Sequence, residues 1–299
     1  MGIPADLEEG ARRALELGTH ARVVWMQSDH WVLTPESAIA FGWMEYLLRS
    51  ERCLRPRCLQ ILGGVGMGKT ALLAQFAQAH PVQTSVDPLR SIRPVLLADA
   101  LAGKEGVLGL RTAIIGAAWP AAVKFDRFTA SEGVLDSTLR TQRVRMILID
   151  EAGELLRNGK STHKNLLREL RRISQRFQIN LVTATVEGLD HVFDLDAQLK
   201  SRFSKVVRLE PWVESEELRA FLRGYERYLP FPERSFLDAK EVVQGVLLMT
   251  QGVTKEIIQL IQDASLLAIE QGASCLTLEI MQEAHSSVVP PAIGVMKRA

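Results

Sequence analysis

The stretch from Leu59 to Phe76, LQILGGVGMGKTALLAQF, is the feature that most limits how this chain can fold. A short apolar run leads into a glycine-rich segment, which is followed by a lysine, a threonine and apolar residues at helical spacing. The segment fits G-x-x-x-x-G-K-[ST], a loop that surrounds phosphate groups with backbone N–H groups. Glycine-rich turns before helices are common, but this one lies between an expected strand (57–62) and an expected helix, as the motif requires.

Each position of this loop has a chemical role. The glycines let backbone N–H groups approach a phosphate and permit positive φ, and the following helix points its N-terminus at the anion. Lys69 is expected to neutralise charge on the β- and γ-phosphates, and the Thr70 hydroxyl to ligate Mg²⁺. We therefore expect ATP and Mg²⁺ as cofactors. The expected nucleotide contacts in this segment are Gly63, Gly64, Val65, Gly66, Met67, Gly68, Lys69, Thr70 and Ala71.

The third expected strand along the chain, VRMILID over residues 144–150, is buried and ends in carboxylates. We expect Asp150 to contact the nucleotide site by holding Mg²⁺ together with Thr70, and Glu151 to polarise the attacking water as a general base. By themselves, carboxylates at the end of one strand are weak evidence for a catalytic site. Next to a phosphate loop they are specific, and the adjacent glutamate favours hydrolysis over simple binding.

Two further positions are candidates for catalysis. The strand over 179–185 ends in VTAT, where Thr185, or else Thr183, is expected to position water or sense the γ-phosphate, although strand propensity alone also accounts for threonine. Arg202 precedes a strand over 205–210 and lies too far along the sheet to act on the nucleotide of its own subunit. It either stabilises charge on a neighbouring subunit's nucleotide or is an ordinary surface arginine.

The order of elements predicts the fold class. Strands alternate with helices up to residue 210, which is typical of an α/β parallel five-stranded sheet with helices on both faces. After Pro211 only helices are expected, over 214–229, 238–250, 254–271 and 277–285. We expect an N-terminal helical approach segment (1–50, with a helix over 35–49), a nucleotide-binding core (51–210), a helical lid (211–285) and a flexible tail (286–299).

Composition excludes several classes of protein. The formal net charge of +1 does not by itself indicate a nucleic-acid partner. The hydrophobic fraction of 47% is enough for a globular core. Three cysteines in 299 residues do not make a disulfide framework. We find no apolar run of the ~18 residues a membrane helix needs, and no signal-peptide pattern at the start. The expectation is a cytoplasmic protein with reduced cysteines and no membrane contact.

The residues in this order resemble the AAA+ ATPases. Within that class, LIDEAGELL, LVTATVEGLDHVFDLDAQLKSRF and LEPWVESEELRAFLRGYERYLP are similar to the TniB/TnsC group of transposition regulators, relatives of MuB. The resemblance covers about residues 20–285. By position, it assigns nucleotide binding to Lys69 and Thr70, metal and base roles to Asp150 and Glu151, and the trans-acting role to Arg202. Lys255 stands near the place of a sensor arginine, and lysine is a poorer bidentate phosphate partner.

The resemblance also implies partners. Members of this group assemble on target double-stranded DNA as rings or helical filaments of identical subunits. They link a target-selection adaptor of the TniQ type to the transposase, and ATP hydrolysis disassembles the filament. This implies a bacterial, nucleoid-associated protein. Two other functions stay open: a replication-initiator or helicase-loader ATPase, and a nucleotide-gated scaffold with little turnover.

Such an assembly needs basic residues that face the DNA. One candidate stretch follows the expected strand RPVLLAD (93–99), and the other follows the carboxylate motif. An arginine face on the helix over 163–177 is as easily explained by solvation as by contact with DNA or a neighbouring subunit. No helix-turn-helix or zinc finger is present, so no base-specific readout is indicated. The expected DNA contacts are Lys104, Arg111, Lys124, Arg157, Lys160 and Lys164.

Overall fold

The computed structural model describes residue 4 and residues 6–84, 91–100, 106–119, 130–156, 160–186 and 190–287. It divides into two compact units. One comprises Glu36–Glu210, and the other combines Met1–Pro35 with Pro211–Ala299. None of the helices in the described ranges is long and apolar enough to cross a membrane.

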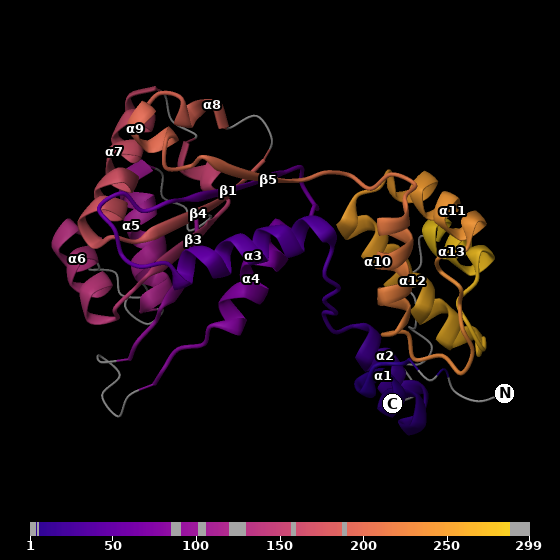
Figure 1. The fold of residues 1–299 in the computed structure, drawn as a ribbon. Coiled ribbons are helices and arrows are strands. Elements are labelled where there is room, and N and C mark those ends of the chain that lie inside the picture. The colour runs from indigo at the N-terminus through magenta and orange to yellow at the C-terminus, as the bar shows by residue number, and fades with distance from the viewer. Residues whose placement is uncertain are drawn as a thin grey trace. The chain divides into compact units, whose positions relative to one another are not determined.

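A parallel sheet forms the centre of the unit Glu36–Glu210 (Figure 1). Its five strands lie in the order β2-β3-β4-β1-β5, and every neighbouring pair is parallel. All strands therefore end at the same edge, and the expected five-stranded parallel sheet is confirmed. The strands are β1 (Leu59–Gly63), β2 (Val95–Asp99), β3 (Met146–Asp150), β4 (Asn180–Thr185) and β5 (Lys205–Leu209).

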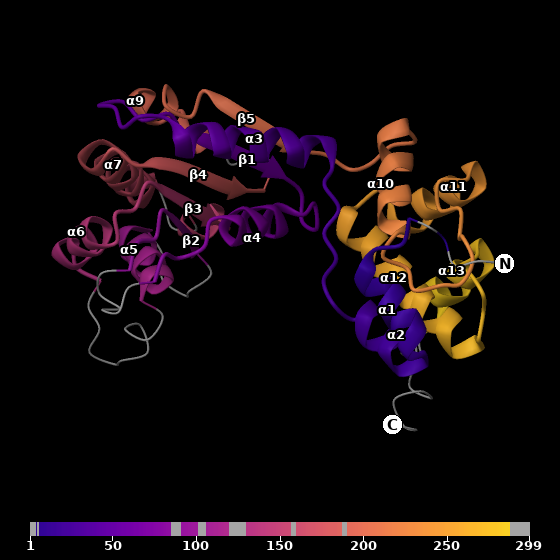
Figure 2. The same ribbon diagram turned by 60° about the horizontal axis from the view of Figure 1, so that its bottom comes forward.

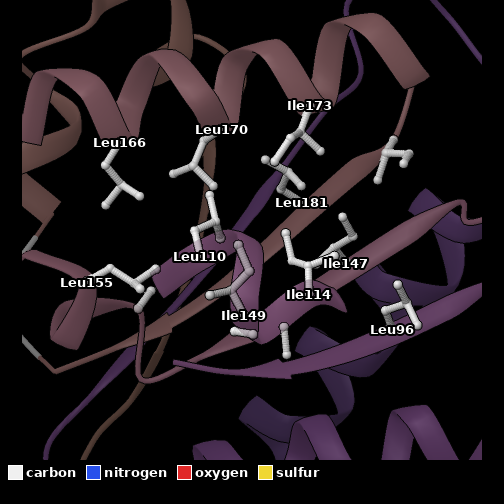
Figure 3. Packing of buried hydrophobic residues seen from close by; sticks show 14 of the residues in the cluster. Leu96, Leu110, Ile114, Ile147, Ile149, Leu155, Leu166, Leu170, Ile173 and Leu181 are labelled. Atoms are coloured by element: carbon white, nitrogen blue, oxygen red, sulfur yellow. The ribbon is translucent and has the colours of Figure 1, made fainter. Parts of the chain in front are cut away.

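Helices cover both faces of this sheet. On one face, Ile147, Ile149 and Leu181 belong to a buried cluster with α5 and α7, and Figure 3 shows Leu170 and Ile173 of α7 above these strand residues. Side chains alternate along each strand, so the intervening residues face the opposite side, where α4 contacts β1, β2 and β3 and packs against α3 through Phe76 and Phe41. The helices and short helical turns are α3 (Pro35–Arg49), α4 (Lys69–Ala79), α5 (Gly106–Ala118), α6 (Glu132–Thr141), η3 (Ala152–Leu156), α7 (Lys160–Phe177), α8 (Asp190–Phe193) and α9 (Ala197–Lys200).

The second unit is built only from helices in its described part. Hydroxyls of Ser215 and Thr277 cap α10 and α13, because each accepts a hydrogen bond from a backbone N–H of the first turn. A single buried cluster joins these helices to the N-terminal segment. The helices are α1 (Glu9–Leu17), α2 (Thr19–Met26), α10 (Glu216–Glu226), α11 (Lys240–Thr250), α12 (Thr254–Gln271) and α13 (Leu278–Ser286).

The N-terminal residues differ from the expected division of the chain. Residues 1–50 were expected to form one approach segment, but Met1–Pro35 groups with the C-terminal helices and Glu36 begins the sheet unit. Val23 and Met26 are buried in the core of the C-terminal helices. The indole N–H of Trp25 donates a 2.7 Å hydrogen bond to the carbonyl of Tyr228. These contacts join segments some 200 residues apart, which no local pattern can reveal.

Candidate nucleotide-binding site

The glycine loop between β1 and α4 has backbone geometry that only glycine adopts easily. Gly66 and Gly68 have φ of 78° and 85°, in the left-handed region. A Cβ on Gly63 would lie 2.7 Å from the carbonyl oxygen of Leu209 on β5. Gly68 directly precedes α4, so the loop is held against the N-terminus of an 11-residue helix. This is the arrangement that binds phosphate through backbone N–H groups and the helix dipole.

The Lys69 ammonium is held inside this loop. Its Nζ donates hydrogen bonds of 2.8 Å to the carbonyls of Gly63 and Gly64, and its side chain is buried. Burial lowers the pKa of Lys69, while Glu151 and Asp150 act in the opposite direction. An ammonium bonded to neutral carbonyls retains its full charge for a phosphate. The structure thus places Lys69 where the motif predicts.

The carboxylates at the end of β3 lie within electrostatic reach of Lys69. Asp150 is buried, and its Oδ1 accepts a 3.0 Å hydrogen bond from the backbone N–H of Glu151. Glu151 has φ of 46°, a turn that ends the strand and begins η3. Burial raises the pKa of Glu151, and Asp150 raises it further, while Lys69 lowers it. A carboxylate with a raised pKa is a stronger base once it is deprotonated.

Asp99 is a site residue that the sequence analysis missed. It ends β2 directly opposite Asp150 in the parallel register. Its charge also contributes to the raised pKa of Glu151. The available signal was that the strand over 93–99 ends in an aspartate, as the strand over 144–150 does. Three strand-end carboxylates therefore face the same edge of the sheet as the phosphate loop.

Thr185 lies in an apolar environment, although its expected role requires a hydroxyl that faces the nucleotide. Thr183 and Thr185 are both fully buried, and their hydroxyls have no hydrogen-bond partner in the described part of the chain. Both line a cavity of about 10 Å³ that is also walled by apolar residues of η3, α7 and α8. They share a sheet face with Ile149, whereas Asp150 is on the other face. In this conformation Thr185 does not point toward Asp150, and its role as a γ-phosphate sensor stays a prediction.

Arg202 lies near the amino ends of the parallel strands, whereas the phosphate loop lies at their carboxyl ends. Its carbonyl accepts a 2.8 Å hydrogen bond from the backbone N–H of Cys58, just before β1 begins, whereas the loop follows the end of β1. The side chain is 9% exposed, and its Nη1 is buried without a partner among the described residues. Arg202 therefore does not meet Lys69 within one subunit, as the sequence indicates.

The expected DNA contacts fall into three groups. Lys104, Lys124 and Arg157 lie outside the described residues, as does the side chain of Lys160. Arg111 donates hydrogen bonds to Glu169 at 2.8 Å and to Glu132 at 3.2 Å, so its charge is already compensated. These ion pairs argue against a contact between Arg111 and DNA. Lys164 is exposed on α7.

Lys255 belongs to the other unit. It lies in the first turn of α12, and its side chain is exposed.

The order of strands and a phosphate loop after β1 place the chain among the P-loop proteins with the AAA+ fold. Similar structures are the Aeropyrum pernix ORC1 protein in complex with DNA (TM-score 0.56, 19% identity, 88% of this chain and 68% of that chain) and the Aeropyrum pernix ORC2 protein in ADPNP–ADP complexes (TM-score 0.58, 16% identity, 90% and 72%). AMPPCP-bound DnaA from Aquifex aeolicus is also similar (TM-score 0.52, 17% identity, 80% and 65%). Identities this low show the fold alone.

The family is shown by a separate comparison. The family model "Bacterial TniB protein" matches residues 22–214, and the chain belongs to this family. A comparison with curated proteins found no match.

Proposed function

We propose that this protein is an ATP-hydrolysing regulator of transposition. It binds double-stranded DNA without sequence preference, assembles on it as a ring or helical filament, and is disassembled by hydrolysis. It links a target-selection adaptor of the TniQ type to the transposase. Membership of the TniB family supports the role, and the loop that encloses Lys69 beside Asp150 and Glu151 supports the chemistry.

The residues present fit ATP and Mg²⁺. The backbone N–H groups of the loop and the Lys69 ammonium would bind the β- and γ-phosphates. The Thr70 hydroxyl and the Asp150 carboxylate are oxygen donors of the kind that Mg²⁺ prefers, and the ion would neutralise phosphate charge. Glu151 would accept a proton from the attacking water. Burial and the neighbouring Asp150 raise its pKa, which makes the carboxylate a stronger base once it is deprotonated.

Turnover is tested with two variants of the full chain. Lys69→Ala should lose ATP binding. Glu151→Gln should bind ATP normally and hydrolyse it about 10²–10⁴-fold more slowly, because it cannot act as a base. Complexes of Glu151→Gln with duplex DNA should then outlive those of the wild type. If turnover and complex lifetime are both unchanged, Glu151 is not the base, and the protein is a hydrolysis-independent scaffold.

DNA binding is proposed for the exposed side of α7. Lys164 and Arg168 are exposed and one helical turn apart, and no ion pair involves either of them in the described part of the chain. Arg176, on the same helix, is instead paired with Asp136 at 2.9 Å. Free cations neutralise phosphates better than cations that already have carboxylate partners.

The test measures binding of duplex DNA with ATP over a range of salt concentrations. Lys164→Gln and Arg168→Gln should each weaken binding of any duplex sequence and reduce the salt dependence by about one phosphate contact. Arg176→Gln is the matched control and should change neither. If the wild type with ATP shows no salt-sensitive binding of duplex DNA, the proposed function is wrong.

A further inference from the structure

The outer face of α3 is apolar although nothing in the described chain covers it. Ile39 and Tyr46 are 56% and 51% exposed, and Trp43 between them is half-buried. Positions 39, 43 and 46 fall on one side of a helix, because they are spaced by four and three residues. We call these three residues the α3 stripe.

The opposite side of α3 is an ordinary core face. Ala40, Met44, Leu47 and Leu48 are buried. Within the helix only Glu36, Glu45 and Arg49 are charged. A helix that is apolar nearly all round is typical of a fully buried position, yet α3 is covered on one side only. Isolated exposed apolar residues need no explanation, but a continuous stripe on one helix marks an interaction surface.

Two cations flank the α3 stripe. The Lys205 ammonium, at the start of β5, lies 5.1 Å from the centre of the Trp43 ring, and Arg57 Nη1 donates a 3.5 Å hydrogen bond to the Tyr46 hydroxyl. Figure 2 shows α3 running beside β5. Among the residues that the structure describes, neither cation has a carboxylate within ion-pair distance. Beside Trp43 and Tyr46, the apolar centre of the surface is therefore flanked by two cations.

We propose that the α3 stripe docks an acidic amphipathic segment of a partner protein. Apolar side chains at helical spacing would cover Ile39, Trp43 and Tyr46, and carboxylates beside them would reach Lys205 and Arg57. Stacking of nucleic-acid bases fits the stripe less well, because Lys205 covers one face of the Trp43 ring and Tyr46 stands edge-on to the ring at 90°. This docking does not depend on ATP hydrolysis.

The test selects peptides from a random display library on the immobilised full chain. Enriched peptides should carry apolar residues spaced by three or four positions together with Asp or Glu. Ile39→Ser combined with Tyr46→Ser should weaken binding of these peptides about tenfold or more. The matched control is Leu248→Ser, which changes an apolar residue that is 84% exposed in the other unit and should have no effect.

A charge reversal adds a readout that a mere loss of structure cannot give. Lys205→Glu should shift the selected peptides from acidic toward basic. The proposal is overturned if no peptide is enriched, or if the enriched peptides bind the stripe variant as tightly as the wild type. It is also overturned if the stripe variant instead loses self-assembly or duplex-DNA binding, because a second copy or nucleic acid would then be the occupant.

Discussion

The backbone N–H of Cys58 donates a 2.8 Å hydrogen bond to the backbone carbonyl of Arg202, which ties the arginine to the start of β1. The phosphate loop follows the other end of the same strand, about 15 Å away along the chain direction. Because a strand's length separates the two groups, we expect Arg202 to act only on a nucleotide that is bound at Lys69 of a neighbouring subunit. Among the residues that the structure describes, the buried Nη1 of the guanidinium also has no hydrogen-bond partner, which costs free energy in an isolated subunit.

The first prediction follows from this separation. Arg202→Ala should bind ATP like the wild type, keep its melting temperature, and hydrolyse ATP in the assembled state about 10³-fold more slowly or worse. Mixing it with Lys69→Ala should restore part of the activity, because each Lys69→Ala subunit offers an intact Arg202 to its neighbour. A steady-state ATPase assay over mixing ratios measures this. A mixture no more active than Arg202→Ala alone would contradict a role in trans.

The second prediction concerns the tight approach of the phosphate loop to β5. Gly63→Ala places a Cβ 2.7 Å from the Leu209 carbonyl oxygen, so backbone must move, at a cost of about 1–3 kcal/mol. Gly64→Ala is the matched control, because its nearest neighbour is Met67 Cγ at 3.8 Å. Thermal unfolding without nucleotide should show a lower midpoint for Gly63→Ala only. Equal midpoints for the two variants would mean that the loop relaxes freely.

The third prediction concerns an ion-pair cluster that joins α5, α6 and α7. Glu169, with a side chain 7% exposed, accepts hydrogen bonds of 2.8 Å from Arg111 and from Arg172. Arg172 also pairs with Asp136 at 2.9 Å. Burial alone would raise the pKa of Glu169, but Arg172 and Arg111 outweigh it and lower the pKa. The depressed pKa means that this stability is present above the unfolded pKa and is lost as pH falls through the folded value.

Removing Glu169 should therefore be costly. Glu169→Leu should lower the free energy of unfolding by about 3 kcal/mol, because it removes a buried carboxylate and leaves two partly buried guanidiniums with fewer partners. Arg176→Gln removes a cation that is 49% exposed at the rim of the cluster and should cost well under 1 kcal/mol. Denaturant unfolding of both variants at neutral pH checks the contrast. Similar losses in the two variants would argue against a buried cluster.

The fourth prediction concerns His30 in the helical unit. Its ring lies 4.6 Å from Trp25 and stacks at 5.0 Å on Tyr228, and its Nε2 is 3.0 Å from the Trp25 carbonyl. Burial lowers the pKa of His30, although the Trp25 carbonyl and Asp29 oppose the shift. The folded state thus prefers the neutral ring. Its contribution to stability is complete above the unfolded pKa of about 6.5 and falls as pH decreases through the folded value.

Melting temperatures at neutral and mildly acidic pH measure this effect. The wild type should lose more stability on acidification than His30→Phe, which keeps an aromatic ring at the position and cannot take up a proton. The other histidines contribute equally to both proteins. If both proteins lose the same amount of stability, the pKa of His30 does not differ between the folded and unfolded states.

The glycine loop and the strands beside it were predictable because their signals are local. Gly63 to Thr70 form a contiguous segment whose geometry follows from glycine conformation, and β1 and β3 are short apolar runs that stop at a loop or a carboxylate. Predicted helices over 35–49 and 254–271 match α3 and α12. Helix α5 was missed, because it is buried on nearly all sides and shows no amphipathic period.

What the sequence by itself determined is therefore the class of fold and the local geometry of the glycine loop, since both depend on residues adjacent along the chain. Only the tertiary structure decided which side chains meet. It aligned Asp99 with Asp150, turned Thr185 to the face opposite Asp150, and neutralised Arg111 with Glu169. It also joined residues 1–35 to the C-terminal helices. Each of these depends on packing between segments distant in the chain, and such contacts leave no local pattern to be read.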